Sequence, residues 1–150
     1  VAWSQQGLRR IILELDHRVK WAGGLSFIGT GASGKSVVID GKREVGLSPM
    51  EMLLLGTGSC ACIDLVMILE KARQKVVDAW VDIGGERREE PPRYYTGIQL
   101  HFVVKGIDIK EHHVKRAIDL AMDKYCSASA QLAALANIET SYEIIEAEVP

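Results

Sequence analysis

Thiol chemistry is the first possibility that this sequence raises, because its 150 residues include three cysteines. Cys60 and Cys62 lie close together in an apolar stretch, and Cys126 follows much later in the chain. A cysteine reacts as its thiolate, so a reactive one needs a neighbouring positive charge or base and access for a substrate. The residues around Cys60 leave open whether it is a nucleophile or a buried structural residue.

The stretch from Ser48 to Lys75 predicts a long helix that carries Cys60 in its middle. Ser48 and Glu51 have the spacing of a capping box, in which each satisfies a free backbone amide of the other. Nearly every residue from Met52 to Leu69 is apolar or small, which leaves no face for water. We therefore expect the helix to be enclosed, with part of its cover supplied by a second subunit.

The helical pitch decides which side chains lie near Cys60. Asp64 follows four residues later and is expected on the same side of the helix. It could hydrogen-bond a neighbouring element or act beside the thiol. Cys62 is turned about 200° from Cys60 and is expected in the core. Gly56 and Gly58 would make room for close approach of another backbone or for open space near Cys60.

Metal binding is the main rival to thiol chemistry, and the local spacing disfavours it. A Cys-x-Cys pair on a helix points its sulfurs apart, and His112 and His113 add no typical ligand spacing. We expect no metal site and no bound cofactor.

The composition excludes several classes of protein. The net charge is −2, from 18 basic and 20 acidic residues, so there is no electrostatic case for nucleic acid or an anionic membrane as a partner. Unpaired cysteines and apolar runs broken by polar residues indicate a soluble, cytoplasmic protein. The length fits one domain over residues 1–150, with residues 1–15 as a leader of uncertain structure in which Leu8 to Leu15 could be helix or strand.

Alternating polar and apolar residues predict strands on both sides of the long helix. The order strands, helix, strands, two helices, strand favours an α+β fold with largely antiparallel sheets. Asp108 is expected to cap the second helix. The charged segment 86–93 is expected to be a solvated hairpin loop, and the alternative is that one of its arginines reaches a subunit interface or the thiol site. The expected strands are 17–21, 25–29, 36–40, 77–83, 94–105 and 138–145, and the two later helices start near residues 108 and 130.

Four segments together resemble the OsmC/Ohr family of thiol-dependent peroxidases, and its OsmC-like branch in particular. They are Ser48-Pro49-x-Glu51, Gly58-Ser59-Cys60-x-x-x-Asp64, Glu86 to Arg93, and Lys124-Tyr125-Cys126-Ser127. The similarity covers about residues 18–145. Two cysteines at this separation make a specific joint signal.

The resemblance implies an OsmC-like fold, in which antiparallel sheets wrap around a long central helix in an intertwined homodimer. It also implies that Cys60 attacks a hydroperoxide and that Cys126 resolves the sulfenic acid as a disulfide. Organic hydroperoxides, reduced in oxidative-stress defence, would be the substrates, and an external dithiol would be the reductant. The substrate-binding residues expected here are Met50, Leu53, Leu54, Phe27 and Asp64.

The sequence departs from the family pattern in two places. Met50 stands where the family has its catalytic glutamate, with Glu51 one residue later, and the first hairpin turn, residues 22–25, has no arginine. Glu51, unless it serves only as a helix cap, is the candidate to replace the glutamate. The candidates to replace the arginine are Arg18, Arg87, Arg88 and Arg93, from the same or the other subunit. A second hypothesis is therefore a catalytically weakened dimer that binds a small apolar ligand or acts as a redox-sensitive regulator, which leaves open whether the chain is an enzyme.

Overall fold

The computed structural model describes residues 15–148, in two compact units divided after Met52. The leader expected over residues 1–15, which includes the undecided element Leu8 to Leu15, lies outside the described residues except for Leu15. Each unit has its own sheet.

The first unit contains a three-stranded antiparallel sheet of β1 (Arg18–Trp21), β2 (Ser26–Thr30) and β3 (Ser36–Asp40). The turn between β1 and β2 has Gly23 and Gly24 at φ of 102° and 54°, a backbone region that favours glycine. These three strands confirm the alternation predicted from the sequence.

A buried carboxylate organises the loop between β3 and the long helix. Asp40 is 2% exposed, and its carboxylate accepts backbone amides from Val45, Lys42 and Glu44 at 2.9 to 3.0 Å. These hydrogen bonds lower the pKa of Asp40, and the bond from the Val45 amide has the largest effect. The loop is thereby fixed just before the helix begins.

Helix α2 (Pro49–Lys71) begins where the sequence predicts. The Ser48 amide donates to Glu51 Oε2 at 2.8 Å and the Glu51 amide donates to Ser48 Oγ at 3.3 Å, which confirms the capping box. The helix ends four residues before the predicted Lys75, because Arg73 turns to a φ of 57° and the chain leaves as a strand.

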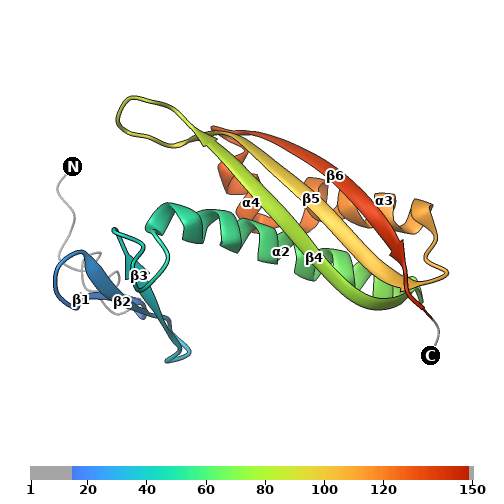
Figure 1. Ribbon diagram of the computed structural model, residues 1–150, viewed down its shortest axis with the longest axis horizontal. Coiled ribbons are helices and arrows are strands. Elements are labelled where there is room, and N and C mark those ends of the chain that lie inside the picture. The colour runs from blue at the N-terminus through green and yellow to red at the C-terminus, as the bar shows by residue number, and fades with distance from the viewer. Residues whose placement is uncertain (1–14, 149–150) are drawn as a thin grey trace, which may run out of the picture. The chain divides into compact units, whose positions relative to one another are not determined.

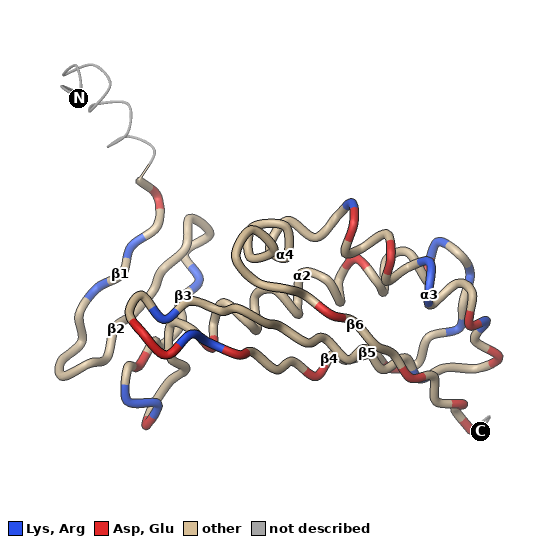
Figure 2. The backbone as a smooth tube through the Cα atoms, turned by 90° about the horizontal axis from the view of Figure 1, so that it is seen from above, with Lys and Arg blue, Asp and Glu red and all other residues tan. Residues whose placement is uncertain are grey.

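The second unit is built on a sheet of β4 (Lys75–Arg87), β5 (Tyr95–Ile107) and β6 (Asn137–Glu146). β4 and β5 are antiparallel, but β5 and β6 are parallel, so the second sheet is mixed. Helices α2, α3 (Glu111–Leu120) and α4 (Ser127–Leu132) all cover one face of this sheet (Figures 1 and 2). The α+β class with two sheets and a long helix is confirmed.

The later helices differ from the prediction at their starts. Lys110, not Asp108, precedes α3 as its N-cap, because Asp108 adopts a φ of 51° and its carboxylate bonds the Lys110 ammonium. A π-helical turn, η1 (Ala121–Tyr125), follows α3 directly, and α4 begins at Ser127, before the predicted residue 130. The apolar stripe of α3 is buried as its spacing predicts, with Val114, Ala117 and Ile118 inside.

The core of the second unit lies between α2, α3 and β5. Ala61, Leu65 and Leu69 of α2 are fully buried, and so are Phe102 and Val104 of β5. A Cβ atom at Gly58 would overlap the Ile83 side chain of β4, so Gly58 is the residue that lets helix and sheet approach closely.

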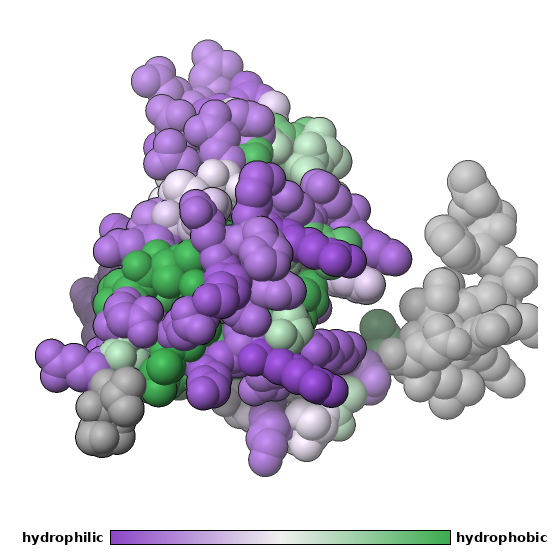
Figure 3. Space-filling view, turned by 90° about the vertical axis from the view of Figure 1, so that its right-hand side faces the viewer, coloured by the Kyte–Doolittle hydropathy of each residue, from purple (hydrophilic) through white to green (hydrophobic). Residues whose placement is uncertain are grey.

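The expectation that α2 is enclosed does not hold within a single chain. Leu53, Leu55, Ile63 and Met67 are 47% to 60% exposed. By length and composition α2 could span a membrane, a property shared by core helices of soluble proteins. One chain therefore leaves much of the apolar surface of α2 uncovered. Elsewhere, Figure 3 shows one face of the molecule on which apolar patches lie between hydrophilic side chains.

Candidate functional site

Three potential ligand or acid–base groups meet in the second unit. The Sγ atoms of Cys60 and Cys126 and a carboxylate oxygen of Asp64 all lie within 4.8 Å of one another. Cys60 and Asp64 come from α2, and Cys126 comes from the junction between η1 and α4. The fold thus joins two segments that are far apart in the sequence.

Helix α2 fixes the first two members of this cluster. Cys60 and Asp64 are four residues apart, so they lie one turn above each other on the same helix face. Asp64 Oδ2 is buried and has no hydrogen-bond partner among the described residues. An unpaired buried polar atom lowers the stability of the fold by about 1–3 kcal/mol, and by more if the group is charged. Such atoms are rare in native proteins, so the unpaired Oδ2 indicates a partner that is not among the described residues.

Cys126 is held more tightly than Cys60. It is 2% exposed, its Sγ accepts the Ser129 amide at 3.4 Å, and its thiol donates to the Thr57 carbonyl at 3.8 Å. Because its sulfur caps α4, the helix starts at Ser127. Burial raises the pKa of the Cys126 thiol, the Ser129 bonds oppose that rise, and the contact with Cys60 adds to it.

Cys62 is not a member of this cluster, in keeping with its predicted position on another side of α2. It is partly buried, and burial raises the pKa of its thiol. Cys62 therefore serves as an internal control for experiments on the other two cysteines.

A cavity of about 390 Å³ opens beside Asp64. Its wall is mainly apolar, and one basic residue contributes to it. The lining residues are Asp64, Met67, Ile68, Lys71, Leu120 and Tyr125. Only Asp64 among these six residues was predicted from the sequence to bind substrate. Residues 64, 67, 68 and 71 have the spacing of one helix face, so the sequence did contain a signal for four of the six.

Of the other predicted binding residues, Leu53 and Leu54 belong to the second unit and are not in this lining. Leu53 is 47% exposed on the first turns of α2, and the Leu54 side chain lies near Gly85 of β4. Phe27 belongs to β2, and Met50 to the first turn of α2.

Of the predicted replacements for the family's activating pair, Glu51 has a local role. Glu51 accepts hydrogen bonds from Ser48 and lies 4.0 Å from Arg43, and the Ser48 bonds lower its pKa. Arg18 is an exposed residue of β1. The Glu51 contacts account for this residue as a helix cap.

The arginines of the segment 86–93 bond within the hairpin that joins β4 and β5. The Arg87 side chain donates to the Arg93 carbonyl, and the Arg88 guanidinium lies 3.6 Å from Glu90 and 5.2 Å from the Tyr94 ring. These contacts agree with the predicted charged hairpin loop.

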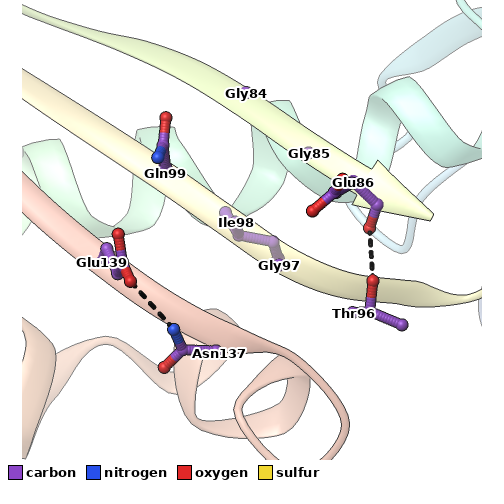
Figure 4. Close-up of a pocket in the computed structure, with 9 residues that line it drawn as sticks. All are labelled: Gly84, Gly85, Glu86, Thr96, Gly97, Ile98, Gln99, Asn137 and Glu139. Carbon is purple, nitrogen blue, oxygen red and sulfur yellow. Dashed lines mark hydrogen bonds between the residues drawn. The ribbon is translucent and has the colours of Figure 1, made fainter.

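The opposite face of the sheet carries a separate, polar groove (Figure 4). Thr96 Oγ1 donates to the Glu86 carbonyl at 3.3 Å, and Asn137 Nδ2 donates to Glu139 Oε1 at 3.1 Å. The lining has no cysteine or histidine, so the groove offers no thiol chemistry.

Comparison with known proteins identifies the relatives of this chain. Residues 40–141 match the family model described as OsmC-like protein. The protein YhfA of Escherichia coli K12 is 50% identical over 131 residues, which cover 87% of this chain and 98% of YhfA.

Two solved structures illustrate the likeness of fold. A hypothetical protein from Aquifex aeolicus has a TM-score of 0.80 at 31% identity, covering 88% of this chain and 96% of its own. A Legionella pneumophila protein described as an organic hydroperoxide resistance protein OsmC has a TM-score of 0.64 at 14% identity, covering 85% and 96%. The family model and the identity to YhfA show that this chain belongs to the OsmC-like protein family.

Proposed function

We propose that this protein reduces organic hydroperoxides through Cys60 and Cys126, as part of defence against oxidative stress in the cytoplasm. The observation that carries the proposal is the meeting of the two sulfurs within 4.8 Å. Cys60 is the more accessible of the pair and Cys126 is buried, which fits Cys60 as the first thiol to meet a substrate.

The reaction would proceed in two steps. The Cys60 thiolate attacks the terminal peroxide oxygen, the O–O bond breaks, and the alcohol leaves with a proton, so Cys60 becomes a sulfenic acid. The Cys126 sulfur then attacks the Cys60 sulfur, and the hydroxyl group leaves as water when the disulfide forms. An external dithiol restores both thiols by exchange.

Two observations support organic rather than inorganic peroxide. The cavity beside Asp64 has apolar walls from Met67, Ile68 and Leu120, which suit an alkyl or aryl group. The Legionella relative in fold is described as an organic hydroperoxide resistance protein.

Stopped-flow mixing with cumene hydroperoxide tests the proposal. Wild-type protein is expected to lose two free thiols for each hydroperoxide consumed, and Cys60→Ser is expected to lose none in the same time. Cys62→Ser, on the same helix but outside the cluster, should behave as wild type. Equal hydroperoxide consumption by wild type and Cys60→Ser would refute the proposal.

We also propose that the protein is a homodimer whose second copy covers α2. Leu53, Leu55, Ile63 and Met67 form the exposed apolar part of this helix, and burial of such side chains is the main driving force for association. Sedimentation velocity should show a dimer for wild type and a shift to monomer for Ile63→Lys. A wild-type protein that stays monomeric at all concentrations tested would contradict this assembly.

The same cavity supports a second candidate function, the binding of a small apolar ligand. Its lining combines apolar side chains with Lys71, an arrangement that suits an apolar molecule with an anionic end. Iodoacetamide distinguishes the two functions, because a peroxidatic Cys60 must alkylate faster than a free cysteine at neutral pH. Alkylation no faster than that favours ligand binding or redox sensing.

A further inference from the structure

The unpartnered carboxylate oxygen of Asp64 is the feature that the hydroperoxide mechanism does not use. Among the described residues, neither a hydrogen-bond donor nor a basic side chain pairs with Oδ2. Lys71 lines the same cavity but forms no ion pair with Asp64. A buried carboxylate that has an unpartnered oxygen and an oxygen within 4.8 Å of two sulfurs is typical of a ligand whose cation is a separate species.

The donor set suits a thiophilic divalent cation. Two cysteine sulfurs and one carboxylate oxygen are typical zinc ligands, with Zn–S near 2.3 Å and Zn–O near 2.1 Å. Around one tetrahedral ion these bond lengths set the donors roughly 3.6–3.8 Å apart. The cluster is within 4.8 Å, so closure on the ion requires only side-chain adjustment of about 1 Å.

A thiophilic cation binds cysteine as the thiolate, so a bound divalent ion would itself favour the deprotonated form of both cysteines.

The surrounding structure positions the ligands and leaves one side open. The Ser129 amide and α4 hold the Cys126 sulfur, and α2 presents Cys60 and Asp64 together. Asp64 also lines the cavity, which gives water or another exchangeable ligand a route to the fourth coordination position.

We propose that the reduced protein binds one Zn²⁺ ion per chain through Cys60 Sγ, Cys126 Sγ and the Asp64 carboxylate. This differs from the expectation of no metal site, which considered only local spacing, whereas these ligands come from two distant segments. If the proposed function holds, the ion leaves when a hydroperoxide takes two electrons from the two thiolates, since the resulting disulfide has no thiolate left to bind it.

Anaerobic titration of the reduced protein with Co²⁺, followed by displacement with Zn²⁺, tests the site without any peroxide. We expect one Co²⁺ per chain, with near-ultraviolet charge-transfer absorption from thiolate to cobalt that Zn²⁺ removes. Cys60→Ser and Cys126→Ser should each reduce this absorption and weaken Zn²⁺ binding. The isosteric Asp64→Asn should keep the absorption and weaken Zn²⁺ binding, because a neutral amide is a poorer zinc ligand than a carboxylate.

Two controls isolate the cluster. Cys62→Ser and Asp82→Asn, which lie on α2 and on the exposed part of β4, should bind as wild type. Circular dichroism of each variant establishes that it is folded before titration. Absence of charge-transfer absorption in wild type, binding by Asp64→Asn equal to wild type, or binding that persists when both cluster cysteines are serine would each overturn the proposal.

Discussion

Cys126→Ser protein treated with organic hydroperoxide is expected to form no intramolecular disulfide and to accumulate oxygen on Cys60 instead. The wild-type pair has its sulfurs within 4.8 Å, so under the proposed mechanism the neighbouring thiol would consume the sulfenic acid on Cys60. Without that thiol, further peroxide converts the sulfenic acid to sulfinic acid, which ordinary thiols do not reduce. Intact-protein mass spectrometry distinguishes the loss of two hydrogens in wild type from the gain of oxygen atoms in the variant.

Cys62 provides the matched control for this experiment, because it is the third free thiol and lies outside the cluster. Cys62→Ser should form the same disulfide as wild type. Disulfide formation in Cys126→Ser would mean that Cys62 resolves the sulfenic acid, and the assigned role of Cys126 would then be wrong.

Leu65→Ala is expected to lower the free energy of unfolding by about 2–5 kcal/mol. Leu65 is fully buried on α2, next along its stripe to Ala61 and Leu69, so the shortened side chain leaves a cavity that the rigid helix and sheet cannot fill. Denaturant unfolding at one fixed protein concentration measures the loss, since an associating protein changes stability with concentration.

Leu135→Ala makes the same chemical change at a residue that is 63% exposed. Its expected cost is only about 0.5 kcal/mol, because little apolar area is lost from the core. Equal effects of the two substitutions would contradict the core described for the second unit.

The position of Cys126 depends on an irregular piece of backbone. α3 runs into the π-helical turn η1, and the chain then leaves the helical region at Cys126, with φ of −70° and ψ of 97°. There the Cys126 amide donates to the Ala121 carbonyl at 2.7 Å. If the α-helix continued, the Cys126 thiol would lie away from Cys60 and Asp64. The interruption of the helical pattern from Lys124 to Ser129, which the sequence shows, therefore allows the two cysteines to meet.

The sequence by itself determined the features that arise from interactions between near neighbours. The Ser48–Glu51 capping box, the amphipathic stripe of α3 and the alternation along β5 each depend on residues a few positions apart, and each is present in the structure. The same local periodicity put Asp64 on the Cys60 side of α2.

Only the tertiary structure decided which distant surfaces meet. The parallel pairing of β6 with β5, the cavity beside Asp64 and the unpaired Oδ2 atom depend on how α2 and the later helices pack on one sheet. Packing also decides which residues of α2 are buried. The sequence of α2 is apolar on all sides and does not indicate which face is inside, whereas in the structure of one chain Leu65 is buried and Ile63 is exposed. Periodicity acts over one or two turns, whereas packing depends on the whole chain.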